Sequence, residues 1–227
     1  MVERIRTEML QSAYGRKKVL TDVTIQADAG ECIGIIGNNG CGKTTLLDIL
    51  SGIRKPAAGQ IFFDGTLPGT LSNIRRYTAY VPQHNNLMEE LTVWDNLLFW
   101  YPDRESAEKA MSEGLLQKLG IEQFAGKKVS RLSGGMKKKA SIACALAGNA
   151  PVLILDEPGT ALDLAAKTEV RAYLNYFKEQ GGCILIATHE EADLELCDRI
   201  YMLKNGKAEQ VDLNMRGIAL MNLLLVD

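Results

Sequence analysis

Short apolar runs rich in β-branched residues recur along the chain, and turn residues bound each of them. Those with the length of buried strands are ECIGIIG (31–37), GQIFFDG (59–65), YTAYVPQ (77–83), VLILDEP (152–158) and CILIATH (183–189). The last two are continuously apolar, which is typical of central strands in a parallel sheet covered on both faces. RIYMLKNGKAEQ (199–210) has a strand-like run on either side of Asn205-Gly206, so it predicts a β-hairpin.

Helical periodicity appears in two parts of the chain. TTLLDILSGI (44–53) has helical spacing directly after the first of these strands. From Gln83 to about Ala147 the spacing is helical, in LTVWDNLLFWY, SAEKAMSEGLLQKLG and GGMKKKASIACALA, with no strand pattern among them. We therefore expect one domain spanning 1–227, in which an α/β core (1–83 and 148–227) is interrupted by an all-helical insert of approximately 84–147.

Composition and charge exclude several other classes of protein. With 26 basic and 28 acidic residues the formal net charge is -2, which gives no nucleic-acid footprint, so we expect no nucleic-acid partner. The runs KK (127–128) and KKK (137–139) are interpreted as solvated faces. The five cysteines form no CxxC pair, which favours reduced thiols in a cytoplasmic protein over a disulfide framework or a zinc site.

The chain also lacks the sequence patterns of membrane insertion. MVERIRTEML at the N-terminus has charges throughout and no apolar core of a signal peptide. The longest late apolar run, IALMNLLLV (218–226), is far shorter than the ~20 residues that a membrane-spanning helix needs. We expect the chain to cross no membrane by itself.

The stretch GNNGCGKT, which begins at Gly37, fits the phosphate-binding pattern G-x-x-x-x-G-K-S/T known as the P-loop. Gly37, Gly40 and Gly42 allow the backbone to curl until successive N–H groups converge on one oxyanion. The following helix adds its N-terminal amides and the positive end of its dipole. Lys43 can reach the terminal phosphates, and the Thr44 hydroxyl can ligate Mg²⁺. The other residues expected to contact the nucleotide here are Asn38, Asn39, Cys41 and Thr45.

A glycine-rich turn that caps a helix is the alternative for this stretch. We favour phosphate binding, because the required strand precedes the motif and the helix follows it. The adjacent helix N-terminus is expected to lower the pKa of the Cys41 thiol. For its biological role, we interpret Cys41 as a small residue that fills space.

Two adjacent carboxylates follow the apolar run VLIL. Asp156 lies where the predicted strand ends, which is the usual place for ligands on an open α/β sheet. Asp156 would belong to the Mg²⁺ shell, and Glu157 could polarise a water for attack on the γ-phosphate. Alone, such a pair is more often a surface turn or a helix cap. The P-loop upstream reverses that preference.

A second glycine-rich helix start lies in RLSGGMKKKASIACALA (131–147). Ser133, Gly134 and Gly135 directly precede the helical pattern, so they offer a hydroxyl and bare amides to an anion. Taken alone, the stretch is as well explained by a serine N-cap with a glycine turn. A chain with one nucleotide cradle and a spare anion-binding helix end suggests that each copy completes another copy's site.

With these motifs in this order, the sequence resembles the ATP-binding cassette (ABC) ATPases, specifically the nucleotide-binding subunit of an ABC transporter. The resemblance covers essentially the whole chain. Tyr14 in AYG matches the aromatic residue that stacks on adenine, and Gln83 in YVPQ matches the Q-loop glutamine. LSGGM (132–136) resembles the signature, ALD (161–163) the D-loop, and His189 in ATHE the switch histidine. The implied fold is a RecA-like P-loop NTPase core, with a mainly parallel sheet, an antiparallel β subdomain and the helical insert.

The resemblance also implies roles and partners. ATP and Mg²⁺ would bind between one cassette's P-loop and the signature of a second cassette, in a homodimer or heterodimer with Asp163 at the seam. Glu157 would be the general base, His189 and Lys43 would contact phosphate, and Gln83 would touch Mg²⁺ and the attacking water. The chain would power transport from the inner face of the cell membrane through separate transmembrane permease subunits.

Two other functions remain open from the residues. One is an ABC ATPase that acts as a mechanical clamp in a soluble assembly. The other is a non-ABC P-loop enzyme such as a small-molecule kinase, which would not explain LSGG. Transport is favoured, because the chain has neither the two cassettes of ribosome-acting relatives nor the long coiled coils of DNA-repair relatives.

The sequence departs from the family pattern at the signature helix. Met136 stands where glutamine is usual, and a thioether cannot supply the hydrogen bonds of an amide. Lys139 stands where arginine is common, which keeps the charge but loses the planar fork. We still expect activity, because the serine and both glycines are present.

The segment after Gln83 carries two apolar stripes at helical spacing. The first is Val93, Leu97 and Trp100, and the second is Trp94, Leu98 and Tyr101. Burial between the core and the insert explains at least one stripe. In the family this region receives the transmembrane subunits, so we expect part of the apolar surface to face such a partner.

Overall fold

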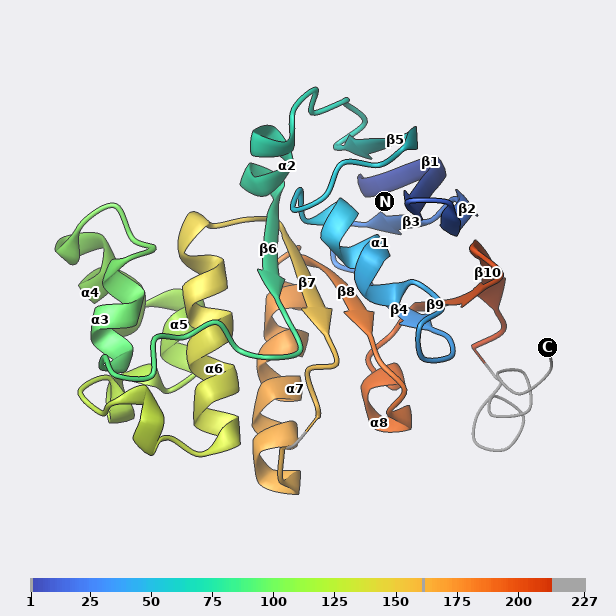
Figure 1. The fold of residues 1–227 in the computed structure, drawn as a ribbon. Helices are drawn as coiled ribbons and strands as arrows, with labels where there is room; N and C mark the ends of the chain where they lie inside the picture. Colours follow the sequence, from blue (N-terminus) through green and yellow to red (C-terminus); the bar gives the residue numbers. More distant parts are fainter. Residues whose placement is uncertain (1, 161, 214–227) are drawn as a thin grey trace.

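The computed structural model describes residues 2–160 and 162–213, which contain a ten-stranded sheet (Figure 1). Its parallel part consists of β4 (Cys32–Ile36), β6 (Thr78–Val81), β7 (Val152–Asp156), β8 (Cys183–Ala187) and β9 (Arg199–Lys204). Its antiparallel part consists of β1 (Glu3–Tyr14), β2 (Lys17–Val23), β3 (Gln26–Asp28) and β5 (Ala58–Phe63). β10 (Lys207–Val211) joins the two parts, because it is antiparallel to β9 and parallel to β2.

The strand order is β3-β1-β2-β10-β9-β4-β8-β7-β6, and β5 pairs with β1. All residues of β4, β7 and β8 are buried, as their continuous apolar runs predict for a sheet covered on both faces. Because these strands are parallel, their carboxyl ends lie along one edge of the sheet. The predicted α/β fold with a mainly parallel core and an antiparallel subdomain is confirmed.

Helices cover both faces of the parallel part. On one face, α1 (Lys43–Leu50) packs against β7 and β8 in a core shared with the antiparallel strands. On the other face, α6 (Gly134–Ala145) contacts β6 and α7 (Leu164–Glu179) contacts β8. This arrangement buries the strands between two apolar layers.

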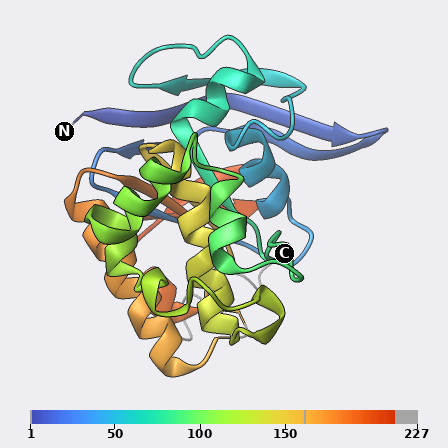
Figure 2. The same ribbon diagram turned by 90° about the vertical axis from the view of Figure 1, so that its left-hand side faces the viewer.

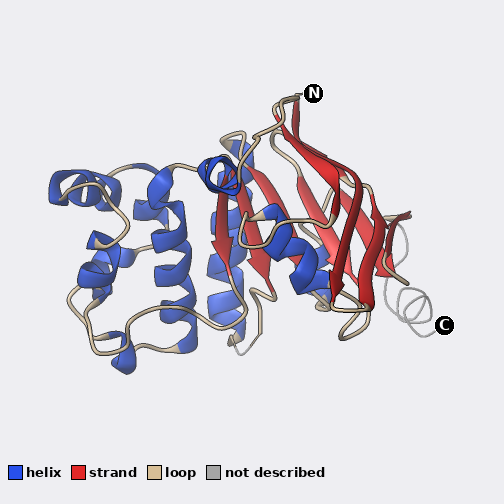
Figure 3. Ribbon diagram, turned by 45° about the horizontal axis from the view of Figure 1, so that its top comes forward, coloured by secondary structure: helices blue, strands red, loops and turns tan. Residues whose placement is uncertain are grey.

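The remaining helices of the insert gather at one end of the molecule, as Figure 3 shows, and the antiparallel strands lie at the other. Between β6 and β7, the described residues form no strand. They form α3 (Val93–Leu98), α4 (Arg104–Ser112), α5 (Gly114–Lys118), α6 and three short 3₁₀ helices, η1 (Ile121–Phe124), η2 (Val129–Arg131) and η3 (Leu146–Gly148). Figure 2 shows the long strand β1 crossing the whole width of the molecule above them.

Several helices and strands differ from those that the sequence pattern predicts. The predicted helix 106–120 breaks at Glu113, whose backbone is extended, into α4 and α5. Tyr77 belongs to α2 (Leu71–Tyr77) rather than to the following strand, and its ring stacks on Phe63 at 4.8 Å. The strands before residue 31 and the helices α2, α7 and α8 (Glu191–Leu194) had no counterpart among the predicted elements.

Among the described residues, no helix is long and apolar enough to cross a membrane. The apolar run 218–226 and Ala161 of the predicted D-loop lie outside the described residues.

Candidate functional site

The loop between β4 and α1 has a backbone that only glycine accommodates. Gly37 and Gly42 have φ of 155° and 113°. A Cβ atom at Gly37 would lie 2.5 Å from the carbonyl oxygen of Leu203, and one at Gly42 would lie 2.8 Å from Cγ1 of Val19. The loop therefore combines positive φ with close backbone approach, and both requirements exclude larger residues.

Lys43 is the first residue of α1 and is buried. Its Nζ donates to the carbonyl oxygens of Gly37 at 2.7 Å and Asn38 at 3.3 Å, so the ammonium lies over the loop. Thr44, the next residue, is exposed, and its hydroxyl donates to Oδ2 of Asp156 at 2.8 Å. A hydroxyl and a carboxylate thus meet at the end of β7, and the residue before that hydroxyl carries the cation.

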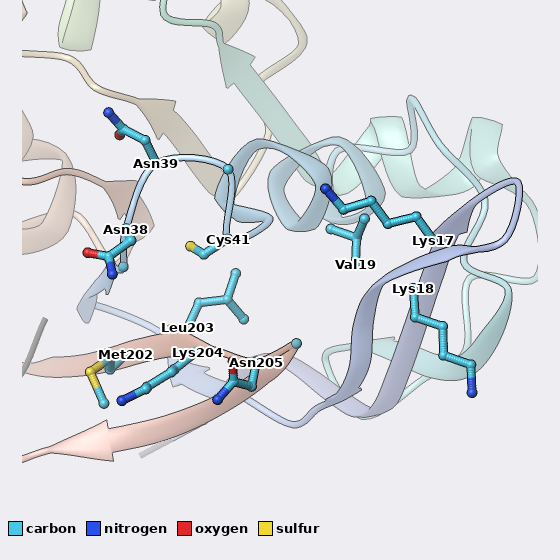
Figure 4. A pocket seen from close by; sticks show the side chains of 13 residues that line it. Lys17, Lys18, Val19, Asn38, Asn39, Cys41, Met202, Leu203, Lys204 and Asn205 are labelled. Atoms are coloured by element: carbon cyan, nitrogen blue, oxygen red, sulfur yellow. The ribbon is translucent and has the colours of Figure 1, made fainter. Parts of the chain in front are cut away.

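A cavity of about 510 Å³ borders the loop between β4 and α1. Its walls are residues 37–41, residues 17–19 of β2 and residues 202–206 of the β9–β10 hairpin (Figure 4). The Cys41 side chain lies between the loop and Leu203 in this view and packs against the buried cluster that includes Leu203. Burial raises the pKa of the Cys41 thiol, although the charge of Lys43 acts in the opposite direction. The expectation of a lowered pKa is wrong, and the structure favours the space-filling role.

Tyr14 is 52% exposed at the end of β1. Its hydroxyl lies 3.4 Å from Oγ1 of Thr45, which connects the ring to the start of α1. The guanidinium of Arg54 lies 3.8 Å from the ring centroid, and its Nη2 donates to the carbonyl oxygen of Ala13 at 2.8 Å. Arg54 was missed in the sequence, because a contact between a ring and a residue forty positions away has no local pattern.

Three side chains contact Glu157, and two of them, Gln83 and His189, come from distant segments of the chain. Oε2 of Glu157 accepts from Nε2 of Gln83 at 3.0 Å and from the hydroxyl of Thr160 at 3.1 Å. Its Oε1 lies 3.3 Å from Nδ1 of His189. Asp156 directly precedes it and is almost fully buried. Gln83, Asp156, Glu157 and His189, all singled out in the sequence, therefore lie together, and Thr160 is an addition.

The backbone of Glu157 and the pKa of Asp156 both depart from their ordinary values. Glu157 has φ of 45°, a left-handed conformation that costs free energy in a non-glycine residue. Burial raises the pKa of Asp156, whereas the hydrogen bond from Thr44 and the charges of Lys43 and Lys138 act to lower it. A buried carboxylate of this kind gains stabilisation from a bound cation.

Ser133 is the N-cap of α6, where its hydroxyl accepts from the N–H of Met136 at 3.3 Å. Gly135 is buried, whereas Ser133 and Gly134 are exposed. In Figure 1 this end of α6 and the loop before α1 lie on the same lower side of the molecule, at different positions along it. Asp163 caps α7 by accepting from the N–H of Ala166 at 2.8 Å.

The interpretation of KKK (137–139) as a solvated face is wrong for its middle residue. Lys138 is 5% exposed, whereas Lys137 and Lys139 form ion pairs with Glu89 and Glu169. Helical spacing could have predicted the burial of Lys138, because it lies three positions after Gly135 and four before Ile142, which are both buried.

A family model described as ABC transporter matches residues 20–160. Nod factor export ATP-binding protein I of Burkholderia orbicola is 38% identical over 204 residues, which span 87% of this chain and 67% of that protein. The sulfate/thiosulfate import ATP-binding protein CysA of Yersinia pseudotuberculosis is 32% identical over 216 residues, which span 91% of this chain and 60% of that protein.

Solved structures extend the likeness to the fold. A structure of the ATP-binding subunit of an ABC transporter is 30% identical and has a TM-score of 0.83, with 98% of each chain covered. A dimeric ATP-binding cassette in a post-hydrolysis state, bound to ADP and Pi, is 28% identical and has a TM-score of 0.79. The alignment covers 93% of this chain and 100% of that cassette.

Proposed function

The chain belongs to the ABC transporter family, and we propose that it is the ATP-binding and ATP-hydrolysing subunit that powers transport through separate transmembrane subunits. The observation that carries this proposal is the group of side chains around Glu157. Gln83, Thr160 and His189 fix a carboxylate directly beside the Thr44–Asp156 contact of the P-loop. A general base must lie next to the phosphate cradle, and this carboxylate does.

The P-loop supplies the phosphate cradle in this proposal. Amides of residues 37–45 and the start of α1 bind the phosphate oxygens, and Lys43 moves from the loop carbonyls to the terminal phosphates. Tyr14 stacks on adenine. Glu157 accepts a proton from the water that attacks the γ-phosphorus, and His189 donates to the γ-phosphate.

The residues present also fit a magnesium ion. Thr44 and Asp156 are 2.8 Å apart and offer a hydroxyl and a carboxylate, and Gln83 adds an amide oxygen. Oxygen atoms are the ligands that Mg²⁺ takes in proteins, and burial of Asp156 without a cation is unfavourable. When bound, the ion neutralises charge on the β- and γ-phosphate oxygens.

We further propose that the working unit is a pair of cassettes. The signature residues Ser133, Gly134 and Gly135 and the P-loop lie on the same side of the molecule, so a two-fold axis can bring one copy's signature onto the other's P-loop. ATP then binds between Gly37–Thr45 of one chain and α6 of its partner. The pair is either a homodimer or a heterodimer.

We also propose where the membrane partners bind and where the domain and its insert begin and end. The transmembrane subunits dock on the insert, which places the chain peripherally on the inner face of the cell membrane. Residues 1–227 form one cassette, with the core in 1–83 and 148–227 and the insert in approximately 84–147.

Glu157→Gln tests the assignment of the base. Removing the carboxylate should lower kcat at least about 100-fold, because general-base catalysis is lost while nucleotide binding remains. ATP should then accumulate in a dimer, measured by light scattering after size exclusion with ATP and Mg²⁺. The control Glu122→Gln, on an exposed glutamate, should hydrolyse ATP at the parental rate. Parental turnover in Glu157→Gln would refute the assignment of the base.

A further inference from the structure

Lys138 is a buried cation to which the proposed mechanism gives no role. Its Nζ donates to the carbonyl oxygen of Pro82 at 3.4 Å, and no ion pair among the described residues includes it. Burying an ammonium without a carboxylate partner destabilises a folded chain. Most of the side chains around α6 are apolar, so an aliphatic residue would be the expected occupant.

The carbonyl that Lys138 binds belongs to the residue immediately before Gln83. Gln83 in turn donates to Oε2 of Glu157 at 3.0 Å. A continuous series of contacts therefore runs from α6 of the insert, through the backbone of Pro82 and the side chain of Gln83, to Glu157.

The segment after β6 lies against α6, as Figure 1 indicates, and a second contact fixes it there. Lys137 Nζ donates to Oε1 of Glu89 at 2.6 Å, and the N–H of Ser130 donates to the carbonyl oxygen of Glu89 at 3.0 Å. The start of this segment, however, is bonded to α6 only through Lys138 among the contacts described above. Lys138 therefore adds a contact from α6 to the end that carries Gln83, directly after Val81, which pairs with Leu155 in the sheet.

The charge of Lys138 also acts on Asp156. Burial lowers the pKa of Lys138, and attraction to Asp156 acts in the opposite direction. Burial raises the pKa of Asp156, and the same attraction acts against that rise, alongside the hydrogen bond from Thr44 and the charge of Lys43. A neutral hydrogen-bond donor could bind the Pro82 carbonyl but would not offset this negative charge.

We propose that Lys138 is a positioning residue for ATP hydrolysis, whose ammonium fixes the Pro82 carbonyl to α6 and thereby keeps Gln83 in contact with Glu157. When the insert shifts relative to the core, Lys138 moves Pro82 with it, so that Gln83 separates from Glu157. The state of the insert thus reaches the carboxylate through one buried side chain. This role rests on the proposed function of Glu157.

Lys138→Met tests the proposal, because methionine keeps an unbranched apolar chain but removes the charge and the donor. We expect an unchanged or higher unfolding temperature, since the cost of burying the charge is removed. The kcat should fall about 10- to 100-fold through loss of positioning. The KM for ATP should stay within about twofold of the parental value. Hydrogen exchange at residues 83–88 of the nucleotide-free protein should become faster.

Two further variants complete the experiment. Lys138→Arg keeps a cation and donors, and should preserve the parental exchange rate at 83–88 and more of the kcat than Lys138→Met. Lys109→Met replaces an exposed lysine of α4, outside this segment and outside the candidate site, so kcat and exchange should remain parental.

Parental kcat or parental exchange in Lys138→Met would overturn the proposal. A loss of stability in that variant would also overturn it, because it would indicate a structural role. The same holds if Lys138→Arg has the same low kcat and the same fast exchange at residues 83–88 as Lys138→Met. The exchange measurement uses no nucleotide, so it decides the role of Lys138 in holding the segment even if the ATPase assignment fails.

Discussion

At the scale of single residues, buried polar side chains hold the chain at the strand end that carries His189 of the candidate site. Thr188 follows β8 and precedes His189, and its hydroxyl donates to Oδ2 of Asp193 at 2.9 Å. The same hydroxyl accepts from the N–H of Glu190 at 3.0 Å. Asp193 is 4% exposed, and this network fixes the chain on both sides of His189.

Asp193→Asn should stabilise the protein at neutral pH. Burial raises the pKa of Asp193 above its ordinary value of 3.8, although the Thr188 hydrogen bond acts to lower it. The folded state therefore binds the proton more tightly than the unfolded state. Stability from this group is present below pH 3.8 and is lost as the pH rises through the folded-state pKa.

The measurement is urea unfolding of both proteins between about pH 4 and pH 8. The variant should exceed the parent at pH 7, and the difference should shrink toward pH 4, where the parental carboxyl approaches the neutral form. Two stability curves that run parallel over this range would contradict the expected shift.

At the scale of elements, the signature helix depends on close packing with α7. A Cβ atom at Gly135 would lie 2.4 Å from Cβ of Ala166, a distance that real side chains do not tolerate. The first turn of α7, capped by Asp163, lies directly against the first turn of α6, capped by Ser133. Gly135 is therefore required for packing within one chain as well as for any anion it binds.

Gly135→Ala should lower the free energy of unfolding by about 1–3 kcal/mol, because the added methyl overpacks the contact with Ala166. Urea titration followed by circular dichroism measures this loss. Gly126→Ala is the matched control, since nothing lies within 4 Å of its added Cβ and its φ is not positive. If both variants unfold at the same urea concentration, close packing at Gly135 is not what requires glycine.

At the scale of the whole molecule, residues of the same apolar stripe after Gln83 differ in burial, although their spacing would place them on one helical face. Val93 and Leu97 are fully buried in the core of the insert. Trp94 is half-buried beside the guanidinium of Arg104, whereas Trp100 is 62% exposed together with its neighbour Phe99. The helix ends at Leu98, so the last residue of the first stripe leaves the helical face.

Trp100→Ala should leave basal ATPase activity and stability near the parental values, because the ring contributes little to the core. Stimulation by the transmembrane subunits should fall, as measured in a reconstituted complex. Trp94→Ala should instead lower the unfolding temperature, since that ring packs on the core. Loss of solubility and of basal turnover in Trp100→Ala would show that the residue is structural.

Local pattern was sufficient for the parallel core and the phosphate loop. A continuously apolar strand, a glycine-rich turn and a helix start each depend on neighbours within a few residues, so the segments at 31–53, 152–158 and 183–189 could be assigned from sequence. β1 could not, because its buried positions change phase between Thr7 and Leu10, at the irregularity between Glu8 and Gln11, which breaks the period of two.

The sequence by itself determined which residues could carry phosphate chemistry, because the P-loop, the Asp156-Glu157 pair and LSGG are contiguous motifs whose geometry follows from local backbone preferences. Only the tertiary structure decided which partners those residues have. Gln83 meets Glu157, Arg54 covers Tyr14 and Lys138 is buried against Pro82, although each pair is separated by tens of residues. Such contacts depend on how helices and strands pack, and packing depends on the shape and burial of the whole chain rather than on any short stretch.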